Sequence, residues 1–173
     1  LVRDDSHTDE LSDLGVNVIL GDATSEEDIK NFISGVKESG EIHAILHCVG
    51  SFAVRPPHAM NKEAFEAVIS TNLTSAFLTL SIAGKAMLSQ GHGRMVFMSS
   101  VAGSLGLVNH EAISAAKGGI ESMVRSAAAT YANRGLRINA VAPGLTDTKL
   151  ASPIMSNESA SLACYQMIPV KSV

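Results

Sequence analysis

The chain has 173 residues, a formal net charge of −4 and a mean hydropathy of +0.20; 46% of its residues are hydrophobic and 4% aromatic. This balance is typical of one compact α/β domain and excludes a disordered or fibrous protein. The 13 lysines and arginines are scattered, so no basic cluster of the kind that binds nucleic acid is present.

No apolar stretch in the sequence approaches the roughly 18 residues of a membrane span, and no signal peptide is recognisable. We therefore expect a cytoplasmic protein with no membrane partner. The two cysteines, Cys48 and Cys164, have no metal-ligand spacing, and no metal site is expected. Cys48 lies in an apolar run, where a buried small hydrophobic residue is the simplest interpretation.

Four apolar runs, over residues 16–22, 43–50, 94–100 and 137–144, are predicted to be buried parallel strands, because they are rich in Val, Ile and Leu and end in turn-forming residues. Helical patterns separate them at 24–40, 61–90 and 111–135.

The first helical pattern begins with a capping box of Thr24 and Glu27. The second is long enough for two helices or one bent helix, and the third ends at Gly135, a good C-terminal cap. This alternation predicts an α/β fold, a doubly wound parallel sheet (Rossmann-like) in a single domain over residues 1–173, with helices on both faces.

Ligands of such folds bind beyond the carboxyl ends of the strands. The motifs found there and in the helices are GDATSEEDI with Asp22, TNLTSAF with Asn72, VFMSSVAG with Ser100, a Lys117 in an Ala-rich helix, and NAVAPGLTDTKL. In order and spacing they resemble the short-chain dehydrogenases/reductases over essentially the whole chain.

The resemblance implies a catalytic site of Ser100, Lys117 and Asn72. Hydride transfer to a carbonyl leaves negative charge on oxygen, which needs a hydrogen-bond donor and an acid. Ser100 can be the donor, Lys117 can hold ribose hydroxyls and lower the pKa of an acid, and Asn72 can bind a water near Lys117. The alternatives are that Ser100 is an ordinary turn residue at a strand end, that Lys117 is a solvated surface lysine, and that Asn72 is a polar residue that caps or kinks a helix.

Ile113 lies four residues before Lys117, where the family has the tyrosine that acts as general acid. Its loss removes a group worth roughly two to four orders of magnitude in rate. His110 precedes Ile113 by three residues and lies on the same face if the helix begins this early, so we hypothesise that it replaces the tyrosine. Glu111 is a poorer candidate because it points about 100° away. The alternative is that His110 only caps the helix or packs the preceding loop.

The segment HCVG over residues 47–50 stands where the family usually has Asn-Asn-Ala-Gly. Gly50 still allows the backbone to approach a cofactor closely. We expect His47 and Cys48 to pack in the core rather than to bind a ligand.

Arg3 favours NADP as cofactor, with NAD also possible, because an arginine at the end of the second strand can bind the 2′-phosphate. Asp22 is expected near the adenine, with a turn residue as the alternative. The implied cofactor-binding residues are Arg3, Asp22, Ala23, Val49, Gly50, Lys117, Pro143, Gly144, Thr146 and Thr148.

The glycine-rich turn that binds pyrophosphate after the family's first strand is absent. The resemblance begins at LVRDD, at the end of the second strand, and stops at IPVKSV, before the last strand. We therefore expect a partial domain that lacks the first and last strands and has unpaired strand edges.

These observations favour an oxidoreductase that transfers hydride between NADP(H) and a small-molecule carbonyl or secondary alcohol. The alternative is a catalytically silent dinucleotide-binding or dimerisation scaffold that has lost its tyrosine. Small residues in the helical segments 74–90 and 115–133 allow close helix packing, and relatives often dimerise there, so a homodimer or homotetramer is expected.

Overall fold

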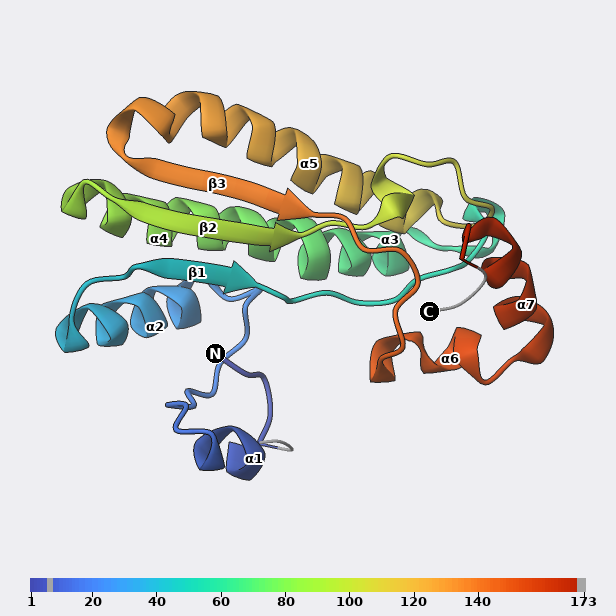
Figure 1. The fold of residues 1–173 in the computed structure, drawn as a ribbon, viewed down its shortest axis with the longest axis horizontal. Helices are drawn as coiled ribbons and strands as arrows, with labels where there is room; N and C mark the ends of the chain where they lie inside the picture. The colour runs from blue at the N-terminus through green and yellow to red at the C-terminus, as the bar shows by residue number, and fades with distance from the viewer. Residues whose placement is uncertain (6–7, 171–173) are drawn as a thin grey trace.

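The computed structural model, which describes residues 1–5 and 8–170, contains one parallel sheet in the order β1-β2-β3 (Figure 1). The strands are β1 (Ala44–His47), β2 (Gly93–Met98) and β3 (Leu136–Val141). They overlap three of the four predicted runs, with β2 and β3 each beginning one residue earlier than predicted. The predicted α/β class with a parallel sheet is confirmed.

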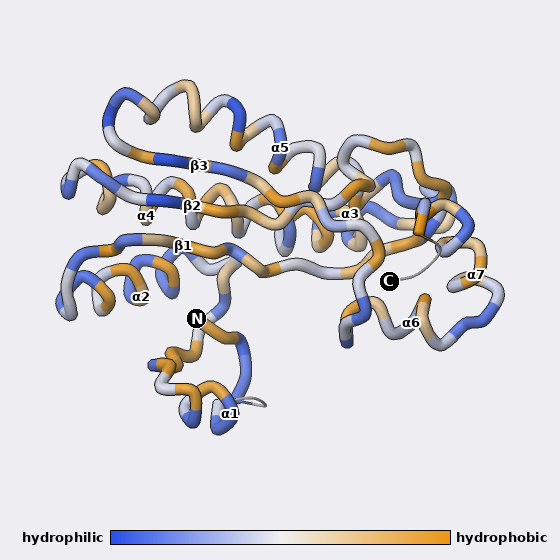
Figure 2. The backbone as a smooth tube through the Cα atoms, in the orientation of Figure 1, coloured by the Kyte–Doolittle hydropathy of each residue, from blue (hydrophilic) through white to orange (hydrophobic). Residues whose placement is uncertain are grey.

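The longer helices follow the predicted order: α2 (Glu26–Ser39), α3 (Lys62–Ile69), α4 (Ser75–Gln90) and α5 (Glu111–Tyr131). The shorter ones are α1 (Thr8–Asp13), α6 (Ser152–Met155) and α7 (Glu158–Met167). Figure 2 shows hydrophobic and hydrophilic residues alternating along α2, as in a helix with one buried face.

The capping box predicted at Thr24 is wrong by one residue. Ser25 is the N-cap of α2, and its hydroxyl accepts the Asp28 amide at 3.2 Å. Thr24 instead donates its amide and its hydroxyl to Asp22 Oδ1, both at 2.8 Å. At the end of α5, a short 3-10 turn leads to Gly135, whose φ of 86° confirms its predicted capping role.

Helices α3 and α4 are two parts of one helix joined by a π-helical turn over Ser70–Thr74. The whole segment Lys62–Gln90 is long and apolar enough, by length and composition, to cross a membrane, which the sequence did not lead us to expect. Its packing against the sheet is that of a core helix, because Ala76, Ala83 and Met87 have no exposed surface.

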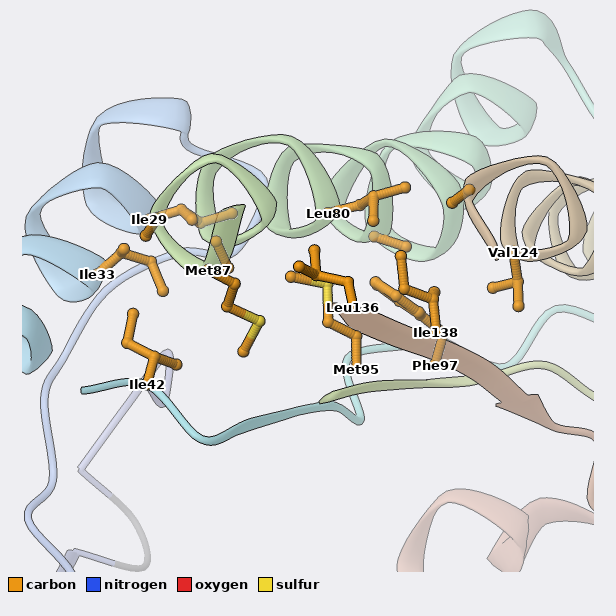
Figure 3. Packing of buried hydrophobic residues seen from close by; sticks show 14 of the residues in the cluster. Ile29, Ile33, Ile42, Leu80, Met87, Met95, Phe97, Val124, Leu136 and Ile138 are labelled. Atoms are coloured by element: carbon orange, nitrogen blue, oxygen red, sulfur yellow. The ribbon is translucent and has the colours of Figure 1, made fainter. Parts of the chain in front are cut away.

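The main core lies between the sheet and one layer of helices (Figure 3). Met95, Phe97, Leu136 and Ile138 point from β2 and β3 toward α2, α4 and α5, which all lie on this face. The alternate strand residues are exposed or half-buried, and Leu46, Arg94 and Arg137 are among the exposed ones. In the described part of the chain, the expected helix layer on the opposite face is therefore not seen.

The strand predicted over residues 16–22 is reduced to a single parallel bridge between Val2 and Leu20. The Val2 amide donates to the Ile19 carbonyl and the Gly21 amide donates to the Val2 carbonyl, both at 2.9 Å. A longer strand needs a partner that pairs with it over several residues. In the described residues, this run pairs only with Val2.

A groove of about 400 Å³ runs along β1, between this strand and residues of α2 and the N-terminal segment. Its lining includes Leu1, Phe32, Ile45 and Leu46. In the described chain β1 pairs only with β2, so the predicted unpaired edge is confirmed.

Candidate active site

The carboxyl ends of the strands bring three loops together. Beyond the ends of β2 and β3, the Ser99 amide still donates to the Val141 carbonyl at 2.7 Å, and the Val101 amide donates to the Pro143 carbonyl at 3.0 Å. The loop that carries Ser100 therefore runs beside the segment that begins at Pro143, as expected for a parallel sheet.

Asn72 lies in the π-helical turn and is fully buried. Its Nδ2 donates to Ser51 Oγ and to the Val68 carbonyl, both at 2.9 Å, and its Oδ1 accepts the Ser51 amide at 3.2 Å. A π turn holds one more residue than an α turn, a feature frequent at functional sites. Asn72 thus fastens the long helix to the loop after β1.

Lys117 is buried, and its Nζ donates to the Met98 carbonyl at 2.8 Å. Burial lowers the pKa of Lys117, and the nearby Cys48 thiol opposes this shift. A Cβ on Gly50 would lie 3.4 Å from Lys117 Nζ and 3.1 Å from Asn72 Oδ1. These two polar groups therefore converge on the backbone of Gly50, and the absence of a side chain there leaves space beside them.

Ser100 lies in the loop after β2 in an extended conformation, with φ −164° and ψ 153°, and is the N-cap of a short 3-10 turn. Its Oγ accepts the Ala102 amide at 3.2 Å. Because that bond uses a lone pair, the Ser100 hydroxyl proton remains available for an oxygen outside the loop.

Ile113 is 7% exposed and packs with Val68, Ala112 and Ala116 in a second apolar cluster. His110 is the N-cap residue of α5, so the helix begins one residue later than the hypothesis of a shared face required. Its Nδ1 donates to the Val108 carbonyl at 2.7 Å, which ties the ring to the preceding loop. That contact leaves Nε2 as the nitrogen that could exchange a proton with a ligand.

A cavity of about 410 Å³ gathers the predicted cofactor residues of the first half of the chain, namely Arg3, Asp22, Ala23, Val49 and Gly50. The hydrogen bonds from the Thr24 backbone and hydroxyl, with a smaller contribution from Arg3, lower the pKa of Asp22. These groups fit a nucleotide: an arginine can bind a phosphate, an ionised carboxylate can bind the polar edge of the base, and an open glycine backbone leaves room for the ribose.

The predicted cofactor-binding residues in the second half of the chain do not line this cavity. Gly144, Thr146 and Thr148 are exposed. Thr146 donates to the Gly144 carbonyl at 3.3 Å, and Thr148 accepts the Ala151 amide at 3.3 Å as the N-cap of a short 3-10 turn. In the segment from Pro143 to Thr148, the carbonyl of Pro143 contacts the loop of Ser100 by accepting the Val101 amide.

In the HCVG segment, the expected core packing is observed for His47 and not for Cys48. His47 is buried, whereas Cys48 is exposed and lines the cavity, so its prediction as a buried residue is wrong. Cys48 lies directly after β1, where it borders the cavity instead of the core between the sheet and the helices.

Within the described residues, no three His, Cys, Asp or Glu side chains converge as a metal site would require. Sequence reasoning missed two polar contacts of the site, Ser51 with Asn72 and Glu121 with Ser99. A serine directly after Gly50, and a glutamate one turn after Lys117, were the available signals.

The chain is similar to known proteins over most of its length. A family model described as Enoyl-(Acyl carrier protein) reductase matches residues 2–173. The cis-4-hydroxycyclohexanecarboxylate dehydrogenase of Sinomonas cyclohexanicum is 34% identical over 149 residues, which cover 85% of this chain and 60% of that protein. The 3-oxoacyl-(acyl-carrier-protein) reductase MabA of Mycobacterium bovis is 33% identical over 153 residues, covering 88% and 61%.

Among solved structures, a proposed NAD(P)-dependent gluconate 5-dehydrogenase from Beutenbergia cavernae, with NADP bound at low occupancy, superposes with a TM-score of 0.87 at 25% identity. The match covers 95% of this chain and 67% of that one. The chain spans about 60% of the length of the curated relatives it matches. The family model and both relatives show that the chain belongs to the short-chain dehydrogenases/reductases.

Proposed function

We propose that the full-length protein is an NADP(H)-dependent oxidoreductase acting on a small-molecule carbonyl or secondary alcohol. The observation that carries this proposal is the convergence of Asn72 and Lys117 on Gly50, at the rim of the cavity lined by Arg3 and Asp22. The NADP bound to the related gluconate 5-dehydrogenase supports the choice of cofactor. When bound, the nicotinamide supplies or takes up hydride.

Each residue then has a distinct part. The Arg3 guanidinium binds the 2′-phosphate, since arginine forms strong charge-assisted hydrogen bonds to phosphate. Lys117 donates to ribose hydroxyls from a position that its bond to Met98 fixes. Ser100 donates its free hydroxyl proton to the substrate oxygen and stabilises the charge that develops there.

His110 is the proposed proton donor. Its Nδ1 is held by the Val108 carbonyl, so protonation places the second proton on Nε2. Apolar Ile113 cannot take this part, and Glu121 is occupied by hydroxyl groups of the loop. Asn72 is held too firmly by Ser51 and Val68 to turn, which suits a fixed anchor for a water molecule.

The decisive experiment compares cofactor binding and carbonyl turnover in the full-length protein and its variants. We expect NADPH to bind more tightly than NADH and Arg3→Ala to remove most of that preference. His110→Ala should lower kcat about 100-fold or more, as loss of a general acid does. His92→Ala is the matched control, because His92 lies before β2, at the end of the sheet opposite Ser100.

Three results would contradict parts of the proposal. Absence of NADP(H) binding would refute the oxidoreductase function itself. An active enzyme that tolerates His110→Ala would show that another group donates the proton. Binding without turnover, with activity gained only in Ile113→Tyr, would identify a silent scaffold.

A further inference from the structure

Glu121 lies on α5, one turn after Lys117, and bridges two points of the loop that follows β2. Its Oε1 accepts the hydroxyl of Ser99 and its Oε2 accepts the hydroxyl of Ser104, both at 2.8 Å. These two bonds, that of Ser104 first, lower the pKa of Glu121. Arg125 Nη1 is 4.0 Å from Oε2, so the two hydroxyls are the closer partners.

The loop lies directly on α5 because two glycines meet there. A Cβ on Gly103 would lie 2.9 Å from Glu121 Oε1 and 2.9 Å from the Gly118 amide nitrogen. A Cβ on Gly118 would lie 3.1 Å from the Gly103 carbonyl oxygen. This close approach is what allows one carboxylate to reach serines five residues apart.

Ser100 lies between the two anchored serines. The Ala102 amide donates to its Oγ at 3.2 Å, and the Gly103 amide donates to its carbonyl at 2.9 Å. The direction of the Ser100 hydroxyl therefore depends on the shape of this loop. The Ser99 hydroxyl also lies 3.1 Å from the Lys117 carbonyl, which ties the loop to the helix that carries Lys117.

We propose that Glu121 is a positioning residue: through Ser99 and Ser104 it fixes the loop on α5 and so sets the place of Ser100 relative to Lys117. The proposal rests on the proposed oxidoreductase function for its kinetic consequence. Its structural part, the fixing of the loop, stands on the hydrogen bonds alone.

The test uses the full-length protein with Glu121→Ala, Glu121→Gln and Ser104→Ala, and Arg125→Gln as matched control. The first readout is hydrogen exchange of the amides of residues 102–105, which does not need activity. We expect exchange to be about tenfold faster or more in Glu121→Ala and Ser104→Ala, an intermediate effect in Glu121→Gln, and no change in the control. The glutamine retains one acceptor oxygen, so it rescues one of the two bonds.

The second readout is steady-state kinetics. We expect Glu121→Ala to lower kcat about tenfold with little change in the KM of the carbonyl substrate, because it displaces a group that acts on the transition state. In a Ser100→Ala background the same substitution should have no further effect on residual turnover, since its action passes through Ser100.

Unchanged exchange in both Glu121→Ala and Ser104→Ala would overturn the proposal even in an active enzyme. Faster exchange without a fall in kcat, or an equal fall in the Ser100→Ala background, would also overturn it. A wild-type protein with no turnover would refute the proposed function, and the exchange data would then decide alone whether Glu121 holds the loop.

Discussion

The stability of the protein should fall between pH 7 and pH 5 because of His47. Ser75 has one hydroxyl proton, and at 2.6 Å it goes to the Thr71 carbonyl. His47 Nε2, 3.1 Å from Ser75 Oγ, must then carry a proton and donate it. Nδ1 is consequently bare, and in the described structure it is buried without a partner.

Burial, with the positive charge of Lys117 adding to it, lowers the pKa of His47 from 6.5 to about 4. Between these values the unfolded chain binds more protons than the folded one, so stability is complete above pH 6.5 and is lost as the pH falls toward 4. The full shift corresponds to about 3 kcal/mol, and the part between pH 7 and 5 to about 2 kcal/mol.

Urea unfolding at pH 7 and pH 5 measures this loss. His47→Asn does not titrate and can still donate to Ser75, so it should lose about 2 kcal/mol less than wild type over this interval. Ser75→Ala should be less stable at both pH values but keep the pH dependence, because His47 stays buried. Equal losses in wild type and His47→Asn, or a His47 NMR titration at the ordinary 6.5, would refute the reasoning.

Three substitutions test the rest of the scaffold. Asn72→Ala removes three hydrogen bonds of a fully buried side chain and should lower the melting temperature by about 5–15 °C, the equivalent of about 2–4 kcal/mol; an unchanged melting temperature would contradict the anchoring role. Gly50→Ala places a Cβ 3.1 Å from Asn72 Oδ1 and should lower turnover about tenfold or more, and full activity would exclude close packing at this point. Gly135→Ala brings its Cβ onto the Gly91 carbonyl oxygen, whereas Gly15→Ala, at a similar φ of 74°, has open space. Denaturant unfolding should show a much larger loss of unfolding free energy for Gly135→Ala than for Gly15→Ala. Equal losses would mean that the positive φ, and not the contact with Gly91, sets the cost of the substitution.

Local sequence patterns were sufficient for the elements that pair with a neighbour in the described chain. The runs that became β1, β2 and β3 are rich in apolar residues, and each leads into a loop that carries a predicted site residue. The run over 16–22 has the same composition, yet it forms only one bridge. Strand formation depends on a partner at long range, which composition cannot report.

The family resemblance supplied the candidate site residues, and sequence patterns did not predict the features of the site that backbone geometry decides. The sequence predicted Asn72 and Lys117, but not the π turn that aims Asn72 at the loop after β1. The position of the N-cap was ambiguous, because Thr24 and Ser25 are both good caps. Glu121 has the pattern of an exposed helix residue, and only the close approach of Gly103 brings its partners within reach.

The polar part of the site is complete without the side chain at position 113. Asn72 is bonded to Ser51 and Val68, and Lys117 is bonded to Met98, so both are held before any ligand arrives. Ile113 packs instead in the apolar cluster beside them. Replacing the tyrosine that the family resemblance implies there thus removes a proton donor but none of the contacts that orient the other groups. If the proposed function is correct, we therefore expect a variant or a wild-type protein to bind NADP(H) independently of proton transfer, so cofactor binding should be measured beside turnover.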